Sequence, residues 1–235
     1  MQSKTTSSVL PKLGRAALLL TSLTLAASMA QAGQVSTPDL SAVYGASNFG
    51  GKPVAIHWLT PGASIVDANL TTIKSFDELL SLAFMSPDAS PVVDAFFVDK
   101  ITGCDGVTGG NFVGCSILSS NVFAVDSSFA AGASGALAIA HELGHTMGLE
   151  HVASGANLMN PALGSAALTS AQVNMILGSS KVQIAPDGSR YIEIRPIAVL
   201  ASAVPEPETY ALMLAGLMLV SAVARRAGRG TTSAR

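Results

Sequence analysis

Three histidines and a glutamate lie close together in the middle of this 235-residue chain, in the segment His141-Glu142-Leu143-Gly144-His145-Thr146-Met147-Gly148-Leu149-Glu150-His151. Residues four apart lie on one face of a helix, so His141 and His145 can bind a single Zn²⁺ ion together. Glu142 then lies beside the metal, where its carboxylate can take a proton from an attacking water and later pass it on. The pattern therefore predicts metal-assisted hydrolysis.

A third ligand must come from outside the regular helix. His151 would point away from the metal if the helix continued to it. Gly148 can adopt a positive φ and end the helix, so that the chain turns back and His151 reaches the same ion. Three histidines with one open position are typical of a catalytic zinc site, whereas a structural site is closed by four protein ligands. A buried helix with incidental histidines is the alternative, and it does not explain the spacing.

The eleven-residue motif resembles that of the metzincin metallopeptidases. Their second signature is a tight turn that carries a methionine, and Asn157-Leu158-Met159-Asn160-Pro161 follows His151 at a fitting distance. Met159 could also be an ordinary core methionine, since the chain has eight. The resemblance covers roughly residues 52 to 177. It implies that Met159 forms an apolar floor below the ligands without binding the metal.

The resemblance also implies a fold. We expect an α/β domain in which a small twisted, mixed sheet packs on the zinc-binding helix, with the Met-turn and a C-terminal helix after it. A peptide substrate would bind as an added strand on an edge strand, which we place between Gly114 and Val125. Val152 follows the third histidine, where the well-known subfamilies carry other residues, so no subfamily is assigned. Pro161 excludes a tyrosine ligand at its position, and the turn looks more like that of matrixins or reprolysins.

Local patterns predict the remaining elements of the domain. Residues 33–51 are expected to form an extended lead-in, and Ser75 with Glu78 forms a capping box that begins a helix. An Ala-rich helix is expected from Phe129 to Gly148. The other predicted elements are strands at 52–59, 92–98 and 121–126, a helix at 169–178, and a hairpin at 181–194 that turns at 186–188.

The two cysteines, Cys104 and Cys115, share one Gly-rich segment. In an exported chain they are expected to form a disulfide that closes this segment as a loop, the alternative being two buried thiols. The fourth histidine, His57, alternates with apolar residues in a predicted strand. We expect it to lie on a sheet face rather than to bind metal.

Both ends of the chain have the pattern of targeting segments. Residues 1–32 combine basic residues, an apolar run and Ala30-Gln31-Ala32, which predicts a signal peptide cut by signal peptidase. A membrane anchor or a buried helix is the alternative, but the apolar run is short for a bilayer.

The C-terminal segment 201–235 contains Pro205-Glu206-Pro207, an apolar run at 210–224 and an arginine-rich tail. This order closely resembles the PEP-CTERM sorting signal of Gram-negative bacteria, the alternative being a plain C-terminal anchor. The resemblance implies transient membrane anchoring through 210–224, followed by cleavage by an exosortase-type enzyme. The domain would then reach the cell surface or extracellular matrix through the periplasm.

The charge of the remaining domain excludes one class of partner. Residues 33–204 contain six basic and 13 acidic side chains, a net charge of −7, and no basic patch that could bind phosphates. We therefore expect no nucleic-acid partner.

The histidine motif and the targeting segments together predict the function. We expect residues 52–200 to form the catalytic domain of a secreted endopeptidase that uses one Zn²⁺ ion and Glu142 as general base. The alternatives are a non-catalytic, zinc-stabilised protein of the exopolysaccharide matrix or cell surface, and a zinc hydrolase of non-peptide amides.

Overall fold

The structure, a computed structural model, describes residues 34–153, 155–201 and 213–221. The predicted signal peptide and most of the predicted sorting signal lie outside these residues. Residues 213–221, within the predicted apolar run 210–224, form a helix. In the described part of the chain, no helix is both long enough and apolar enough to cross a membrane.

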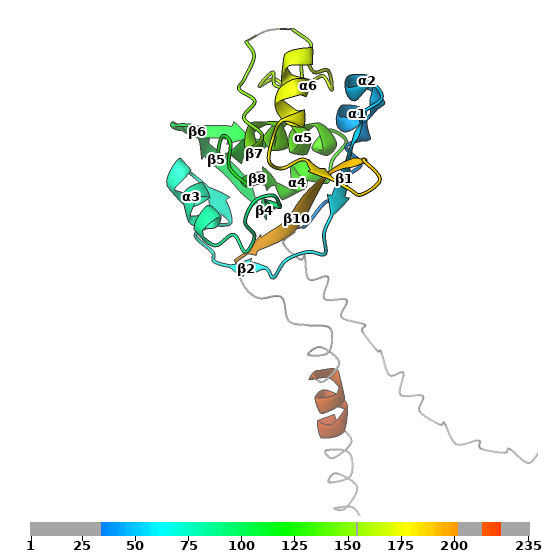
Figure 1. Cartoon of the computed structure of the whole chain (residues 1–235). Helices are drawn as coiled ribbons and strands as arrows, with labels where there is room; N and C mark the ends of the chain where they lie inside the picture. The colour runs from blue at the N-terminus through cyan, green and yellow to red at the C-terminus, as the bar shows by residue number, and fades with distance from the viewer. Residues whose placement is uncertain (1–33, 154, 202–212, 222–235) are drawn as a thin grey trace, which may run out of the picture. The chain divides into compact units, whose positions relative to one another are not determined.

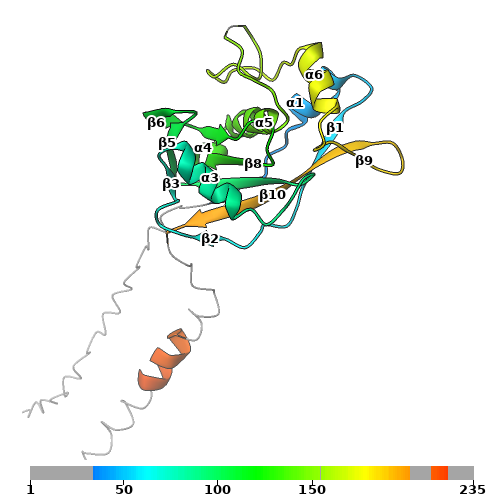
Figure 2. The ribbon, with the colours of Figure 1, turned by 60° about the vertical axis from the view of Figure 1, so that its left-hand side comes forward.

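A twisted mixed sheet forms the centre of the domain (Figures 1 and 2). Its strand order is β1 (Val54–Trp58), β10 (Arg190–Leu200), β4 (Val93–Val98), β8 (Val122–Asp126) and β7 (Gly114–Ser116). The first four of these strands are parallel, and β7, at the edge, is antiparallel to β8. Two short strands, β2 (Ile65–Val66) and β9 (Gln183–Ile184), add to the ends of β10. The predicted α/β class with a mixed sheet is confirmed.

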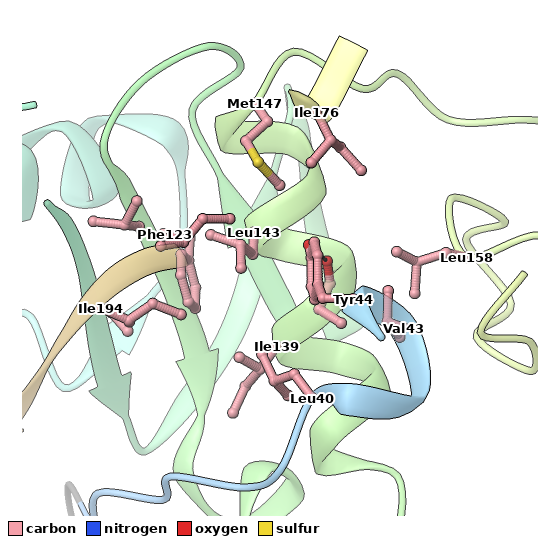
Figure 3. Close-up of a cluster of buried hydrophobic side chains, with 14 of the residues drawn as sticks. Leu40, Val43, Tyr44, Phe123, Ile139, Leu143, Met147, Leu158, Ile176 and Ile194 are labelled. Carbon is pink, nitrogen blue, oxygen red and sulfur yellow. Dashed lines mark hydrogen bonds between the residues drawn. The ribbon is translucent and has the colours of Figure 1, made fainter. Parts of the chain in front are cut away.

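Each face of this sheet is covered, so its central strand β4 is apolar except for Asp94. All six residues of β4 are buried; Ala95 and Phe97 face one hydrophobic cluster, whereas Phe96 and Val98 face the other. The first cluster packs on α5 (Gly135–Thr146) and is shown in Figure 3. The second packs on α3 (Phe76–Phe84) and on a three-stranded sheet of β3 (Thr72–Ile73), β5 (Lys100–Cys104) and β6 (Val107–Phe112).

The extended lead-in predicted for residues 33–51 is wrong in its second half. Residues from Ser41 onward form two short helices, α1 (Ser41–Tyr44) and α2 (Ala46–Phe49). Their apolar side chains, with Leu40, belong to the cluster around α5 (Figure 3). The burial of Tyr44 and its neighbours makes this segment part of the domain.

The single helix predicted from Phe129 to Gly148 is also wrong, because the chain breaks it in two. Asp126 caps the short helix α4 (Ser127–Ala130) by accepting from the backbone N–H of Phe129, and α5 begins only at Gly135. The turn packs so tightly that a Cβ at Gly135 would lie 1.9 Å from the carbonyl oxygen of Ala130. This close approach requires glycine and sets the start of α5.

The Gly-rich cysteine segment is a hairpin rather than a loop. Strands β5 and β6 turn through Asp105 and Gly106, both at positive φ, and the predicted disulfide joins Cys104 on β5 to Cys115 on β7. The disulfide thus ties the three-stranded sheet to the edge of the main sheet.

The C-terminal part of the domain contains the predicted helix and hairpin, but its last strand is longer than predicted. Thr169 and Gln172 form the predicted capping box of α6 (Ser170–Leu177), and β9 pairs with β10 in the predicted hairpin. The last strand was expected to end near Ile194. It continues to Leu200 and lies between β1 and β4, because its apolar residues fill the centre of the sheet.

A buried carboxyl lies where β4 begins. Asp94 is fully buried; its Oδ2 accepts from Ser86 Oγ and from the N–H of Asp88, whereas its Oδ1 has no partner among the described residues. Burial, with a smaller contribution from the nearby Asp88 carboxylate, raises the pKa of Asp94 from 3.8 to about 6. Arg195 pairs with Asp88 at the same place.

We predict that Asp94→Asn stabilises the domain at neutral pH. Below about pH 3.8 Asp94 is protonated in both the folded and the unfolded state, so it does not lower the stability. Because folding raises its pKa, the free energy of unfolding falls as pH rises from about 3.8 to about 6, by about 3 kcal/mol at most, and levels off above this range. Urea unfolding of the metal-free proteins at several pH values measures this. The stability gained by the variant should grow between pH 4 and pH 7.5, and a gain that is constant with pH would contradict the prediction.

Candidate functional site

Three histidine side chains converge at the C-terminal end of α5. His141 is buried, His145 is half-buried and His151 is exposed, and their Nε2 atoms lie 3.1 Å from one another in all three pairs. His151 reaches the other two because the helix ends at Thr146 and Gly148 adopts a φ of +89°. The chain therefore turns back as the motif predicts.

The nitrogen spacing fits one zinc ion. A tetrahedral zinc ion with Zn–N bonds of about 2.0–2.1 Å holds its ligand atoms about 3.3–3.4 Å apart, close to the observed separations. Imidazole nitrogens are also among the donors that zinc prefers. His141, His145 and His151 would hold the ion.

Backbone carbonyl groups orient two of the rings. His141 Nδ1 donates to the carbonyl oxygen of Leu158 at 2.7 Å, and His145 Nδ1 donates to that of Leu149 at 2.6 Å. Since a carbonyl can only accept, the proton lies on Nδ1 and the lone pair of each Nε2 faces the metal position. Burial also lowers the pKa of His141 to about 4 and that of His145, which favours the neutral, metal-binding form.

The turn at Met159 lies directly against the zinc helix. Met159 is fully buried, and its Sδ packs so close to Gly144 that a Cβ there would lie 2.7 Å from the sulfur. Asn157 closes the turn by accepting from the N–H of Met159, and it exchanges two hydrogen bonds with Gln172 of α6. The turn thereby fixes the carbonyl group of Leu158 that orients His141.

Glu142 points toward the edge strand β7. It is buried, and its Oε2 accepts a hydrogen bond of 2.7 Å from Ser116 Oγ. A Cβ at Gly114 would lie 2.4 Å from Oε1, so only glycine leaves room for the carboxylate. Burial raises the pKa of Glu142 to about 7, and the hydrogen bond from Ser116 partly opposes this rise.

Gly114 and Ser116 were not among the predicted site residues. Side chains alternate between the two faces of a strand, so the two residues that flank Cys115 must face away from the side on which Cys115 lies. This alternation in the predicted edge strand could have indicated both residues. Cys115 faces the second hydrophobic cluster and the disulfide, whereas its two neighbours face the zinc helix.

The free edge of β7 presents main-chain groups beside Glu142. The carbonyl oxygen of Val113 accepts from the N–H of Asp126, and the N–H of Ile117 donates to the carbonyl oxygen of Val122, so both residues pair with the β8 side. Along an antiparallel ladder, the main-chain groups of successive residues point alternately toward the partner strand and away from it. Gly114 and Ser116 therefore turn their N–H and C=O groups to the open edge.

The N-terminal segment braces the site from the other side. Tyr44 donates from its hydroxyl to the carbonyl of Ala140, directly before His141. The Asn48 side chain donates a hydrogen bond to the carbonyl oxygen of Ala166 and accepts one from the N–H of Leu168. Between these two residues, the carbonyl oxygen of Ala167 accepts from the N–H of Leu158. No feature of the sequence alone pointed to these contacts.

His57 lies apart from the histidine cluster. It is exposed on β1 and stacks on Tyr191 of β10, with ring centroids 4.7 Å apart. It is the sheet-face histidine that the sequence favoured, and the three-histidine group found in the described part of the chain does not include it.

Comparison with known proteins agrees with this site. Residues 67–152 match the sequence model of the reprolysin-like metallopeptidases of family M12B, a segment that contains α5 and all three histidines. No curated protein and no solved structure matches the chain significantly. The family match and the histidine cluster together support a zinc metallopeptidase.

We predict that Asn48→Ala weakens the zinc site although Asn48 touches no ligand. The substitution leaves the backbone groups of Ala166 and Leu168 unpaired, which should lower the unfolding free energy by about 1–3 kcal/mol. Loosening of the turn should weaken zinc binding about tenfold, as when outer partners of ligands are removed. Competition with a chelating indicator measures this. Zinc affinity equal to that of the control Ser47→Ala, on the exposed side of α2, would refute the bracing role.

Proposed function

We propose that this protein is a secreted zinc-dependent endopeptidase with Glu142 as its general base. The observation that carries the proposal is the position of the Glu142 carboxylate. It is buried one residue from the first histidine and held against an edge strand whose main-chain groups face outward. A hydrolytic centre and a peptide-binding edge thus lie side by side.

Each residue then has a defined task. A zinc ion held by His141, His145 and His151 would supply Lewis-acid chemistry, making a water molecule more acidic and polarising a carbonyl group. Glu142, whose pKa burial raises to about 7, is placed to take a proton from a water molecule beside it and to pass it to the leaving amine. Ser116 holds the carboxylate in place from the edge strand.

The edge strand favours a polypeptide substrate. The N–H and C=O groups of Gly114 and Ser116 match main-chain amides, which an extended peptide presents at regular spacing. A small non-peptide amide has no such repeat, so the open edge of β7 supports peptide hydrolysis over hydrolysis of non-peptide amides.

Burial of Glu142 argues against the non-catalytic matrix protein. Burying an ionisable carboxyl costs free energy, and a zinc ion that only stabilises the fold gains nothing from such a group. The glycine required at position 114 serves the same carboxylate.

Export and sorting complete the proposal. The disulfide between Cys104 and Cys115 is compatible with an oxidising compartment, as expected if signal peptidase removes residues 1–32. By its resemblance to PEP-CTERM signals, segment 201–235 would anchor the protein transiently through 210–224. An exosortase-type enzyme would then release it at the surface or into the extracellular matrix of a Gram-negative bacterium.

We predict that Glu142→Gln abolishes proteolysis without loss of zinc. The amide keeps the shape of the side chain and an acceptor for Ser116 but cannot take a proton, so casein cleavage by the zinc-loaded protein should fall at least about a hundredfold. Zinc content is measured in parallel. The control Glu150→Gln changes the exposed glutamate of the same motif and should retain activity. If wild type binds zinc yet cuts no protein, the endopeptidase proposal fails and the matrix protein becomes the leading alternative.

We predict that Gly114→Ala has nearly the same effect through a residue outside the motif. The added methyl group would lie 2.4 Å from Glu142 Oε1, and the carboxylate must move to make room. Casein cleavage should fall at least about tenfold with zinc content unchanged. Gly51→Ala, where nothing lies near the added carbon, is the matched control. Full activity in Gly114→Ala would show that the position of the carboxylate is not critical.

A further inference from the structure

A cavity of about 540 Å³ opens where β7 and α5 both begin. Phe112, Val113 and Phe129 supply apolar walls, and the turn at 132–134 closes one side. Asp126 is the only charged side chain in the lining. The proposed mechanism does not use this cavity.

Two elements give its distance from Glu142. Along the edge, Glu142 lies against both Gly114 and Ser116, and Val113 precedes them by one and three residues, about 3 to 10 Å at the rise of a strand. Along α5, Gly135 follows the cavity lining and lies seven residues before Glu142, about 10 Å. A peptide extended on β7 would therefore bring to the cavity a residue one to three positions from its scissile bond.

The carboxylate of Asp126 is already fixed in direction. Its Oδ1 accepts from the N–H of Phe129 at 3.0 Å and from Ser128 Oγ at 2.6 Å. Both hydrogen bonds use the same oxygen, and none from the described residues reaches Oδ2. A held carboxylate beside two aromatic rings matches a side chain with a long apolar stem and a cationic head.

We propose that this cavity receives a lysine or arginine side chain of the bound peptide, one to three residues from the scissile bond. The inference rests on the proposed peptidase function. It adds a preference that the zinc site cannot supply, because the three histidines and Glu142 act only on the peptide group. The net charge of −7 over residues 33–204 also favours encounter with basic segments.

Cleavage-site profiling tests the proposal. Wild type, Asp126→Asn and the control Asp187→Asn are each incubated with a peptide library, and the products are identified by mass spectrometry. Asparagine caps helices as well as aspartate, so α4 is preserved, and the control removes an equal charge on the distant β9–β10 turn. We expect lysine and arginine to be enriched at one position one to three residues from the bond in wild type and control, but not in Asp126→Asn.

A matched peptide pair gives the size of the effect. A peptide with lysine at that position should be cleaved about tenfold more efficiently, in kcat/KM, than one with glutamine, and Asp126→Asn should remove the difference. Calorimetry with zinc-loaded Glu142→Gln should show the same preference in binding, independently of turnover.

The outcomes separate this inference from the peptidase proposal. Proteolysis without a basic preference, or a preference unchanged in Asp126→Asn, overturns the inference and leaves the peptidase intact. If no protein or peptide is cleaved and the inactive variant binds neither peptide, both proposals fall together.

Discussion

The convergence of three imidazole nitrogens within 3.1 Å of one another is the constraint on which the rest of the structure depends. Helical spacing supplies two of them without cost, but the third requires a chain reversal, which the positive φ of Gly148 allows. Two rings are then locked by backbone carbonyls, one in the segment after the helix and one in the turn at Met159. The helix end, the turn and the brace from Asn48 all serve this geometry.

The edge strand β7 connects the chemistry to the scaffold. Because side chains alternate along a strand, its single cysteine lies in the core side of the sheet and forms the disulfide, while Gly114 and Ser116 face the zinc helix. Gly114 and Ser116 also turn their main-chain N–H and C=O groups to the open edge of the sheet. A covalent anchor, the position of Glu142 and the open edge of the proposed peptide-binding site thus come from a segment of three residues.

Two buried carboxyl groups, those of Glu142 and Asp94, lower the stability of the fold when they are ionised. Glu142 is held by one hydroxyl at a place where a proton acceptor is useful, so its cost serves the proposed function. Asp94 lies at the start of β4 with one oxygen unpaired among the described residues, and no chemistry at the site uses it. Buried groups of the same type therefore need their surroundings before a role can be assigned.

Local sequence determined the features whose signals are short-range: the helix of the histidine motif with its Gly148 turn, the capping box of α6, the buried strand β4 and the three-histidine cluster. Tertiary structure alone decided the rest. The central place of β10, the packing of residues 40–49 on α5, the break before Gly135 and the contacts of Glu142 all join residues far apart in the chain. Periodicity and spacing report which face of an element is buried, but they do not say which distant segment covers it.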